Sequence, residues 1–429
     1  MNDLARKTSL ASRIRNVRSP GGIEAWLIED YTVPLISLEC AFLGGAAQDP
    51  AGKAGVASML AGLLDEGAGP YDSTAFHERL DDFAIEVSFG ADRDGFSGHL
   101  RTLIRHKAEA FDMLKLALNE PRFDEEPLER VRAQLVASVL QEANDPDAMA
   151  NRAWFTTAFP DHPYANPNRG SLETLAAITR GDLIDYKARI LARDTLKIAV
   201  VGAIDAASLS IELDKVFGPL PKQSRRVAIP RVTPQGIGTR KIIDLDIPQS
   251  SVRFGAAGIG NDDPDWHVAV VLNQILGGGV FSSRLFREVR EKRGLAYSVS
   301  SSIAPFDFAP LHMGGTSTKN ERVAESLSII EAEITSLAKD GPFDEELDVA
   351  KKYLTGSYLL RFDTSQKLAS QLVQIQIDQF GQDYMDRRNG LIASVTREDA
   401  ARVAKRLYGE GKLLVTIVGR PVGIDAVKG

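Results

Sequence analysis

The sequence predicts an α+β fold built from two homologous copies of one domain. Two observations favour it. Similar segments recur along the chain at offsets between 214 and 220 residues. Each copy also reads as β-like runs followed by runs of helices, a pattern typical of helices packed on a mostly antiparallel sheet. A chain of 429 residues is too long for one ordinary core, so two domains are the natural expectation.

Four pairs of segments carry the evidence for an internal duplication. They are "FLGGAAQDP" ending at 50 and "AAGIGNDDP" ending at 264, "FDEEPLERVRAQL" from Phe123 and "FDEELDVAKKYL" from Phe343, "TRGD" from Thr179 and "TRED" from Thr396, and "KIAVVG" ending at Gly202 and "LVTIVG" ending at Gly419. All four pairs occur in the same order and within six residues of one spacing. Self-similarity at a fixed offset indicates a repeated structural unit.

The predicted boundaries follow from this repeat. We expect an N-terminal domain over residues 20–218, an extended linker over 219–240 and a C-terminal domain over 241–429. The linker holds four prolines and five basic residues. Proline fixes φ and removes a backbone donor, so this stretch favours a tether over a core element.

The elements of the two copies are expected in the same order. The first copy predicts a β-run at 34–45, a helix at 54–65, a β-run at 84–103, helices to about 192 and a β-run at 197–202. The second predicts a β-run at 251–259, a helix at 264–276, a β-run at 296–317, helices to 408 and a β-run at 414–419. A further short helix begins at Ser282 or Ser283 and ends at Gly294, because serine caps helix starts and glycine ends helices.

Composition and charge exclude several classes of protein. Apolar residues make up 44% of the chain and charged residues 25%, which is ordinary for a soluble globular protein. The formal charge of −7 offers no basic footprint for nucleic acid. No run approaches the length of a membrane span. The single cysteine, Cys40, excludes an internal disulfide and lies in an apolar run, so we expect a core residue.

The compartment stays open. The first nineteen residues hold five basic residues and no continuous apolar stretch, so they are not an export signal as written. The chain therefore reads as soluble and cytoplasmic, or as periplasmic where a signal peptide has been removed.

No cofactor site is predicted within this chain. No two of the six histidines lie four residues apart, so no helical turn offers paired imidazoles to a metal ion. The glycine-rich "NQILGGGVFSSRLF" lacks the Gly-Lys-Ser/Thr ending of a phosphate loop. It remains a turn that allows close backbone approach.

The helix predicted at 54–65 carries an unusual face. Ser58, Ala61 and Gly62 stand at i, i+3 and i+4 and share one side of the helix. All three positions have almost no side chain, and a glycine inside a helix costs about 1 kcal/mol relative to alanine.

A basic segment with a tyrosine follows the glycine-rich stretch. In "SSRLFREVREKRGLAYSVSSS", arginines recur at every third position, and a strand begins at Leu295. They are Arg284, Arg287, Arg290 and Arg293. Taken alone, this pattern indicates a solvated basic face, and Tyr297 reads as a half-buried strand aromatic.

The repeat, the linker and "LFREVREKRGLAYSVSS" together resemble the M16 metallopeptidases, the insulinase and mitochondrial-processing-peptidase family, in its small bacterial two-domain branch. The resemblance covers about residues 20–420. Family members carry His-x-x-Glu-His on the first helix of the first domain, where two imidazoles bind zinc and the glutamate activates a water. Here that motif falls on Ser58–Gly62, and serine, alanine and glycine bind no zinc. Glu142 lies near the family's third carboxylate, and its role is left open.

The resemblance assigns catalytic roles to two residues of the basic segment. The family's arginine and tyrosine match Arg290 and Tyr297, which face the zinc across the substrate chamber, hold the substrate main chain and stabilise the oxyanion. Guanidinium and phenol groups suit this work because both donate hydrogen bonds toward developing negative charge. The resemblance assigns no such role to Arg284, Arg287 or Arg293.

The resemblance therefore implies the zinc-free subunit of a two-subunit peptidase that is inactive alone. The zinc belongs to a partner, either a different M16 chain in a heterodimer or higher heteromer, or a second copy in a homodimer. The substrate is a peptide that binds extended along a sheet edge. The rival interpretation is a scaffold, like the inactive core subunits of respiratory complexes that share the fold. We also expect the bare face at Ser58, Ala61 and Gly62 to border a water-filled chamber and to accept larger side chains.

Overall fold

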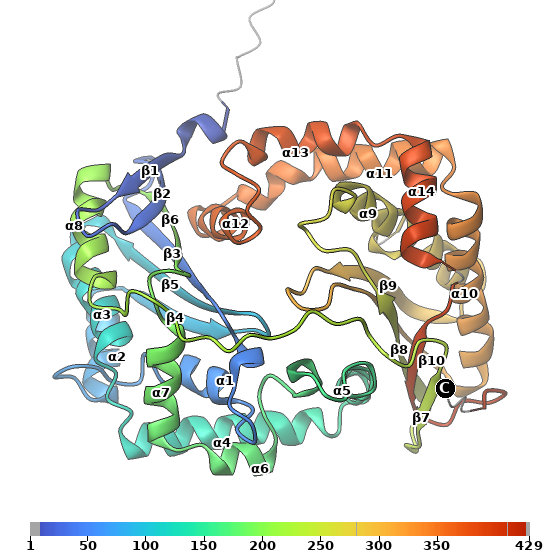
Figure 1. The fold of residues 1–429 in the computed structure, drawn as a ribbon, viewed down its shortest axis with the longest axis horizontal. Coiled ribbons are helices and arrows are strands. Elements are labelled where there is room, and N and C mark those ends of the chain that lie inside the picture. Colours follow the sequence, from blue (N-terminus) through green and yellow to red (C-terminus); the bar gives the residue numbers. More distant parts are fainter. Residues whose placement is uncertain (1–8, 280, 410, 426–429) are drawn as a thin grey trace, which may run out of the picture. The chain divides into compact units, whose positions relative to one another are not determined.

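A computed structural model describes residues 9–279, 281–409 and 411–425. The chain divides into two compact units, each with one β-sheet, covering helices and its own hydrophobic core (Figure 1). The first unit comprises 1–139, 167–227 and 359–388, and the second comprises 140–166, 228–358 and 389–429. The predicted α+β architecture with two copies is confirmed.

The first sheet has six strands in the order β1-β2-β6-β3-β5-β4. All its neighbours run antiparallel except β2 and β6, which are parallel. The strands are β1 (Arg15–Arg18), β2 (Glu24–Glu29), β3 (Leu35–Leu43), β4 (Glu86–Ala91), β5 (Gly95–Leu103) and β6 (Lys197–Gly202). Side chains alternate between the two faces of a strand. On β3, Leu38, Cys40 and Phe42 are accordingly buried in the core.

The second sheet has five strands and repeats the topology of the first sheet without a counterpart of β1. Its order is β7-β11-β8-β10-β9, which matches β2-β6-β3-β5-β4 of the first sheet, including one parallel pair. The strands are β7 (Arg240–Ile243), β8 (Gln249–Ala257), β9 (Ala296–Ala304), β10 (Leu311–Lys319) and β11 (Leu414–Val418). Each long predicted β-run, 84–103 and 296–317, is a two-stranded hairpin in the structure. Strand β9 lies at the sheet edge.

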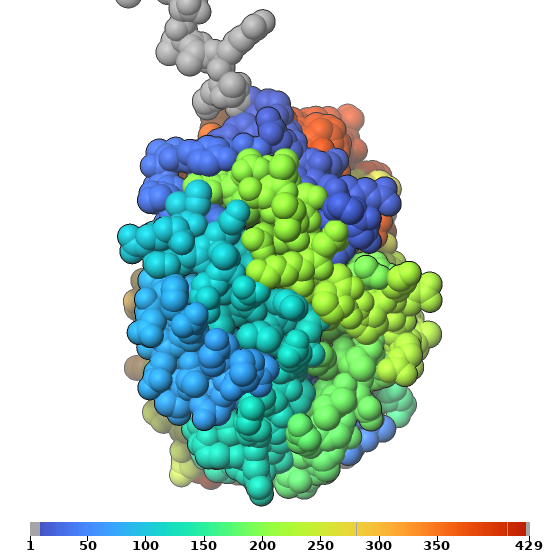
Figure 2. Space-filling model, turned by 90° about the vertical axis from the view of Figure 1, so that its left-hand side faces the viewer, coloured from blue at the N-terminus to red at the C-terminus, as the bar shows by residue number. Residues whose placement is uncertain are grey.

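The helices also follow the duplication. The first half contains α1 (Val56–Ala61), α2 (Ser73–Asp82), α3 (Lys107–Asn119), α4 (Glu125–Glu142), α5 (Pro146–Ala158), α6 (Leu172–Ala177), α7 (Arg180–Ile190) and α8 (Ala206–Phe217). The second half contains α9 (Trp266–Asn273), α10 (Val323–Asp340), α11 (Asp344–Gly356), α12 (Ser365–Ile377), α13 (Tyr384–Ala393) and α14 (Arg397–Tyr408). Thr179 caps α7 and Thr396 caps α14, as their repeated sequence predicts. Figure 2 shows blue, cyan and green segments of the first unit side by side on one face, among which α3 contacts α8.

Each sheet is also covered by a helix from the other half of the sequence. Helix α5 packs on β8 and β11, and Trp154 of α5 donates from its Nε1 to the Leu414 carbonyl at 3.0 Å. Helix α12 packs on β3 and β6, and Gln376 donates to the Ile198 carbonyl at 2.9 Å. The compact units therefore cross the boundaries predicted for the two copies along the sequence. The boundaries 20–218, 219–240 and 241–429 remain a prediction about where the repeated sequence begins and ends.

Cys40 is buried on β3, as expected of a core residue. Burial raises the pKa of its thiol well above the usual value, so the thiol stays protonated and unreactive. Within the described residues, no helix combines the length and apolar character that a membrane crossing requires.

Candidate functional site

Two π-helical turns flank the glycine-rich stretch of the second unit. Helix α9 ends at Asn273 and continues as η5 (Gln274–Gly278), and the basic segment forms η6 (Phe286–Glu291). The i→i−5 bonding shows in the amides of Gly279 and Lys292, which donate to Gln274 and Arg287. The sequence predicted ordinary α-helices here, and that prediction was wrong because both segments contain π-helical turns. Single π-turns are rare and occur frequently at functional sites.

A glycine ends η6 and leads the chain into the edge strand. Gly294 has φ +59°, a left-handed conformation that glycine adopts without strain. At the other end, the Ser283 hydroxyl accepts a bond from the Phe286 amide at 3.4 Å. Both ends of the short predicted helix are therefore confirmed, and Tyr297 follows three residues after Gly294.

Tyr297 lies in a β-bulge at the start of β9. The pairing of β10 with β9 shifts by one residue between Thr316 and Thr318, so Tyr297 and Ser298 both oppose Ser317. A bulge of this kind re-aims a side chain and is common beside active sites. Tyr297 is 83% exposed, which excludes the alternative interpretation of a half-buried strand aromatic.

Arg290 and Tyr297 are in contact. The guanidinium carbon of Arg290 lies 4.8 Å from the centroid of the Tyr297 ring and 4.8 Å from that of the Phe286 ring. Stacking of this kind fixes the guanidinium plane and leaves its N–H donors pointing outward. Among the described residues, no carboxylate lies within ion-pair distance of Arg290. The structure thus brings together the two residues predicted to act as a pair, with their donors available.

Arg284 departs from the predicted solvated basic face. Its side chain is 3% exposed and binds Glu346 of α11 through two hydrogen bonds, Nε to Oε1 at 2.9 Å and Nη2 to Oε2 at 2.6 Å. Burial acts to raise the pKa of Glu346, but the bonds from Arg284 and the Phe343 amide lower it overall. A bidentate buried pair of this kind ties the start of the basic segment to α11.

Glu288 holds the other end of η6. Its carboxylate accepts from Lys292 at 2.7 Å and from Arg293 at 2.8 Å. Burial acts to raise the pKa of Glu288, but these bonds and one from Arg287 outweigh it and lower the pKa to about 2. Three of the four predicted basic residues, Arg284, Arg287 and Arg293, therefore form ion pairs that fasten the segment, and Arg290 differs from them.

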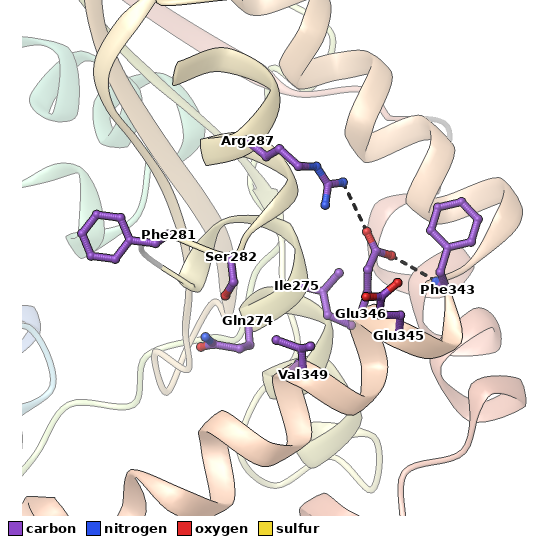
Figure 3. Close-up of a pocket in the computed structure, with 10 residues that line it drawn as sticks. Gln274, Ile275, Phe281, Ser282, Arg287, Phe343, Glu345, Glu346 and Val349 are labelled. Atoms are coloured by element: carbon purple, nitrogen blue, oxygen red, sulfur yellow. Dashed lines mark hydrogen bonds and ion pairs between the residues drawn. The ribbon is translucent and has the colours of Figure 1, made fainter. Parts of the chain in front are cut away.

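A pocket of about 380 Å³ lies between η5, the basic segment and α11 (Figure 3). Its apolar wall is formed by Ile275, Phe281, Phe343, Val349 and Ala350. Its polar lining is formed by Gln274, Ser282, Arg287, Glu345 and Glu346. The sequence did not predict this pocket. Phe343 was identified only as part of the repeated segment, and a π-helical turn has no periodic pattern by which the sequence could reveal it.

The predicted bare face in the first unit is covered at Ala61, whereas Ser58 is half-buried and Gly62 is exposed. Helix α1 is only six residues long, and Gly62 is its C-cap rather than an interior residue. The Ser58 hydroxyl donates to the Asn168 carbonyl at 2.8 Å, and Ala61 is only 6% exposed. A Cβ on Gly62 would lie 3.1 Å from a methyl group of Val131. The expectation of a face open to water was therefore wrong at Ala61, because packing covers it.

The residues at these positions do not fit a zinc site. An alcohol bound to a carbonyl, a methyl group and a glycine offer no imidazole, carboxylate or thiolate. Over residues 9–279, 281–409 and 411–425, no group of three or more His, Cys, Asp or Glu side chains could hold a metal ion. Glu142 is the last residue of α4 and belongs to the second compact unit, whereas Ser58 belongs to the first.

Comparison with known proteins gives consistent matches. The family profile described as the peptidase M16 inactive domain matches residues 177–354. The chain is 28% identical over 337 residues to the non-peptidase homolog YmxG of Helicobacter pylori, covering 78% of each chain. It is 26% identical over 414 residues to an uncharacterized zinc protease of Streptomyces coelicolor, covering 94% of this chain and 89% of the relative.

Solved structures agree in fold. A crystal structure of a peptidase M16 inactive domain from Pseudomonas fluorescens superimposes with a TM-score of 0.90 at 25% identity, covering 97% of this chain and all of that one. A protease from Helicobacter pylori superimposes with a TM-score of 0.84 at 17% identity, covering 94% and 99% of the two chains. The chain is therefore similar over most of its length to M16 peptidases and to a non-peptidase homolog, and its residues 177–354 match the profile of the M16 inactive domain.

Proposed function

We propose that this chain is the zinc-free subunit of a two-subunit M16 peptidase and supplies Arg290 and Tyr297 to a peptide held by a zinc-bearing partner. The observation that carries the proposal is the geometry of this pair. An exposed phenol stands in a bulge at a sheet edge, stacked on a guanidinium that has no ion-pair partner in the described part of the chain. The Tyr297 hydroxyl and the Arg290 guanidinium can therefore both donate hydrogen bonds to a bound peptide.

The chemistry of the pair suits peptide hydrolysis. A peptide lying extended beside β9 presents its main-chain carbonyl oxygens to the edge. Arg290 donates to one carbonyl and holds the chain in place. Tyr297 donates a hydrogen bond from its hydroxyl to the oxygen that gains negative charge as the carbonyl is attacked. The fixed backbone at Gly294 and at the bulge positions both donors before the substrate arrives.

The alternative is a scaffold with the M16 fold and no part in catalysis. The relative named a non-peptidase homolog favours it. The placement of Tyr297 speaks against it, because the exposed ring stands in an edge-strand bulge and contacts an arginine that has no ion-pair partner among the described residues.

Substitution of the pair in the reconstituted complex tests the proposal. Tyr297→Phe removes one hydroxyl and keeps the ring, so turnover should fall about 10²–10³-fold, the usual loss for one oxyanion donor. The loss should appear in kcat rather than KM, because the bond strengthens in the transition state. Arg290→Lys keeps the charge but loses the planar fork and should also impair turnover.

Two conservative substitutions serve as matched controls. Tyr353→Phe removes an exposed hydroxyl from α11, and Arg322→Lys alters an exposed arginine paired with Glu325. Both should leave turnover unchanged. Wild-type rates for Tyr297→Phe and Arg290→Lys, in a complex whose assembly is intact, would favour the scaffold.

A further inference from the structure

We infer that the pocket beside η5 takes one large apolar side chain of the peptide that Arg290 and Tyr297 hold. The inference rests on the proposed function, since it requires a peptide at that pair. Beyond the proposed function, the inference specifies the preferred substrate residue, which is a leucine, methionine or phenylalanine at one position of the peptide.

The shape and lining of the pocket fit such a side chain. Ile275 and Ala350 are buried at its wall, and Val349 stands half-exposed. Phe281 and Phe343 lie on opposite sides of the pocket and are 73% and 61% exposed (Figure 3). Large apolar side chains that gather at the surface mark binding sites. A volume of about 380 Å³ is also within the range of pockets that hold small ligands.

A buried donor at the pocket wall points to a bound carbonyl. Gln274 is 8% exposed, and its Nε2 has no acceptor among the described residues. A buried amide left without a partner costs about 1–3 kcal/mol, so native proteins seldom keep one without use. A peptide residue brings a carbonyl oxygen together with its side chain. It would satisfy Gln274 while its side chain covers the apolar wall.

The charges of the lining restrict the side chain further. Glu345 and Glu346 contribute two carboxylates, and Arg287 contributes one guanidinium. Glu346 is held by Arg284 and lies 3.5 Å from Arg287. Glu345 has no ion pair within the described part of the chain. The carboxylates disfavour an acidic side chain, and Arg287 disfavours a basic one, so an uncharged side chain is preferred.

A continuous series of contacts joins the pocket to the Arg290–Tyr297 pair. The ring of Phe281 meets that of Phe286 edge to face at 5.3 Å between centroids. Phe286 in turn lies under the guanidinium of Arg290, which stacks on Tyr297. A single peptide that lies against these rings reaches both the pair and the pocket.

Binding of defined peptides to the full chain tests the inference. The probes are fluorescent ten-residue peptides of Ser, Gly, Asn and Thr with one guest residue, Phe, Leu, Ala or Glu, and the readout is fluorescence anisotropy. Burial of the side chain should make the Phe and Leu peptides bind about 10-fold more tightly than the Ala peptide. The Glu peptide should bind no better than the Ala peptide.

Val349→Trp fills the pocket from an exposed position and should bring the Phe-to-Ala affinity ratio close to one. Ile211→Trp, at an exposed position of α8, is the matched control and should keep the wild-type ratio. Equal affinities for all guests, absence of binding, or an unchanged ratio in Val349→Trp would overturn the assignment. Tyr297→Phe turnover decides the proposed function separately, because it is measured with one fixed peptide.

Discussion

The two copies differ most at the same point of their shared topology. In the first copy, the helix after β3 is the short α1, which packs on α7 and β4 and ends at the buried Ala61. In the second copy, the helix after β8 continues as η5, and a pocket stays open between η5 and α11. One fold therefore carries a covered position at Ala61 in one copy and an open pocket in the other. The two copies differ here in the small side chains of Ser58, Ala61 and Gly62 and in the π-helical turn η5.

In each copy an ion pair joins the segment after the first helix to a later helix. The acidic and basic partners are exchanged between the two copies. In the first copy Glu66, after α1, accepts from Arg130 of α4 at 2.9 and 2.8 Å. In the second copy Arg284, after η5, donates to Glu346 of α11. The two pairs link similar parts of each copy, but they lie at positions that do not correspond in the repeat, since Arg130 is seven residues after Phe123 and Glu346 three residues after Phe343.

The largest expected effect tests whether the first copy is closed. Ala61→Glu places a carboxylate where packing leaves only 6% exposure, so folding should lose several kcal/mol. Ala207→Glu is the control, because Ala207 is exposed in the first turn of α8, where a carboxylate is favourable. Urea denaturation measures both. Equal stability of the two variants would mean that Ala61 borders water, as the sequence alone suggested.

An effect of intermediate size is expected on the free energy of unfolding when the ion-paired acids Glu66 and Glu288 are replaced. Bonds from Arg130 lower the pKa of Glu66 to about 2, and the bonds described above lower that of Glu288 to about 2, against a usual value of 4.5. Because these folded-state values are depressed, the ionised acids stabilise the protein above pH 4.5, and this stabilisation is lost as the pH falls toward 2. Glu66→Gln and Glu288→Gln should each cost about 1–3 kcal/mol at pH 7 and less than half as much at pH 3.

The control for these acids is Glu129→Gln, an exposed partner of Arg132 whose loss should be small at any pH. The measurement is the midpoint of urea unfolding at each pH. A penalty for Glu66→Gln or Glu288→Gln that does not change between pH 7 and pH 3 would show that charge is not what holds these joints.

The smallest effect tests the equivalence of the copies. Thr179 and Thr396 cap α7 and α14 in the same way, with the hydroxyl accepting from Asp182 at 3.4 Å and from Asp399 at 3.0 Å. Thr179→Ala and Thr396→Ala should each cost about 1 kcal/mol. Thr335→Ala, at an exposed position within α10, gives the cost of the substitution without a cap. Costs that differ widely between the two caps would argue against equivalent roles.

The sequence was sufficient for the fold because duplication leaves local signals at fixed offsets. The caps at Thr179 and Thr396 appear where their repeats predict, and the strands β6 and β11 end at Gly202 and Val418, within one residue of the prediction. The helix exchange of α5 and α12 could not be predicted, because it depends on contacts between distant segments and has no local pattern. The same holds for Ala61, whose burial depends on what packs over it.

The candidate site was predicted only in part. Arg290 and Tyr297 were identified by a resemblance, while their contact depends on a π-turn and a bulge that sequence periodicity does not reveal. The interpretation of Arg284 as a surface residue failed because its partner, Glu346, lies 62 residues away. The pocket went unpredicted for the same reason, since its two walls come from separate helices.

The central claim is that this chain completes a site whose zinc belongs to another chain, and titration of the two subunits tests it most directly. A zinc-bearing M16 chain with His-x-x-Glu-His, sought first in the neighbouring reading frame, is held at fixed concentration while this chain is added and peptide hydrolysis is followed. The account predicts no hydrolysis by either chain alone, a rate that saturates at equimolar mixing, and zinc in the partner only. Full hydrolysis by the partner alone, or one tightly held zinc per copy of this chain with chelator-sensitive hydrolysis, would contradict it.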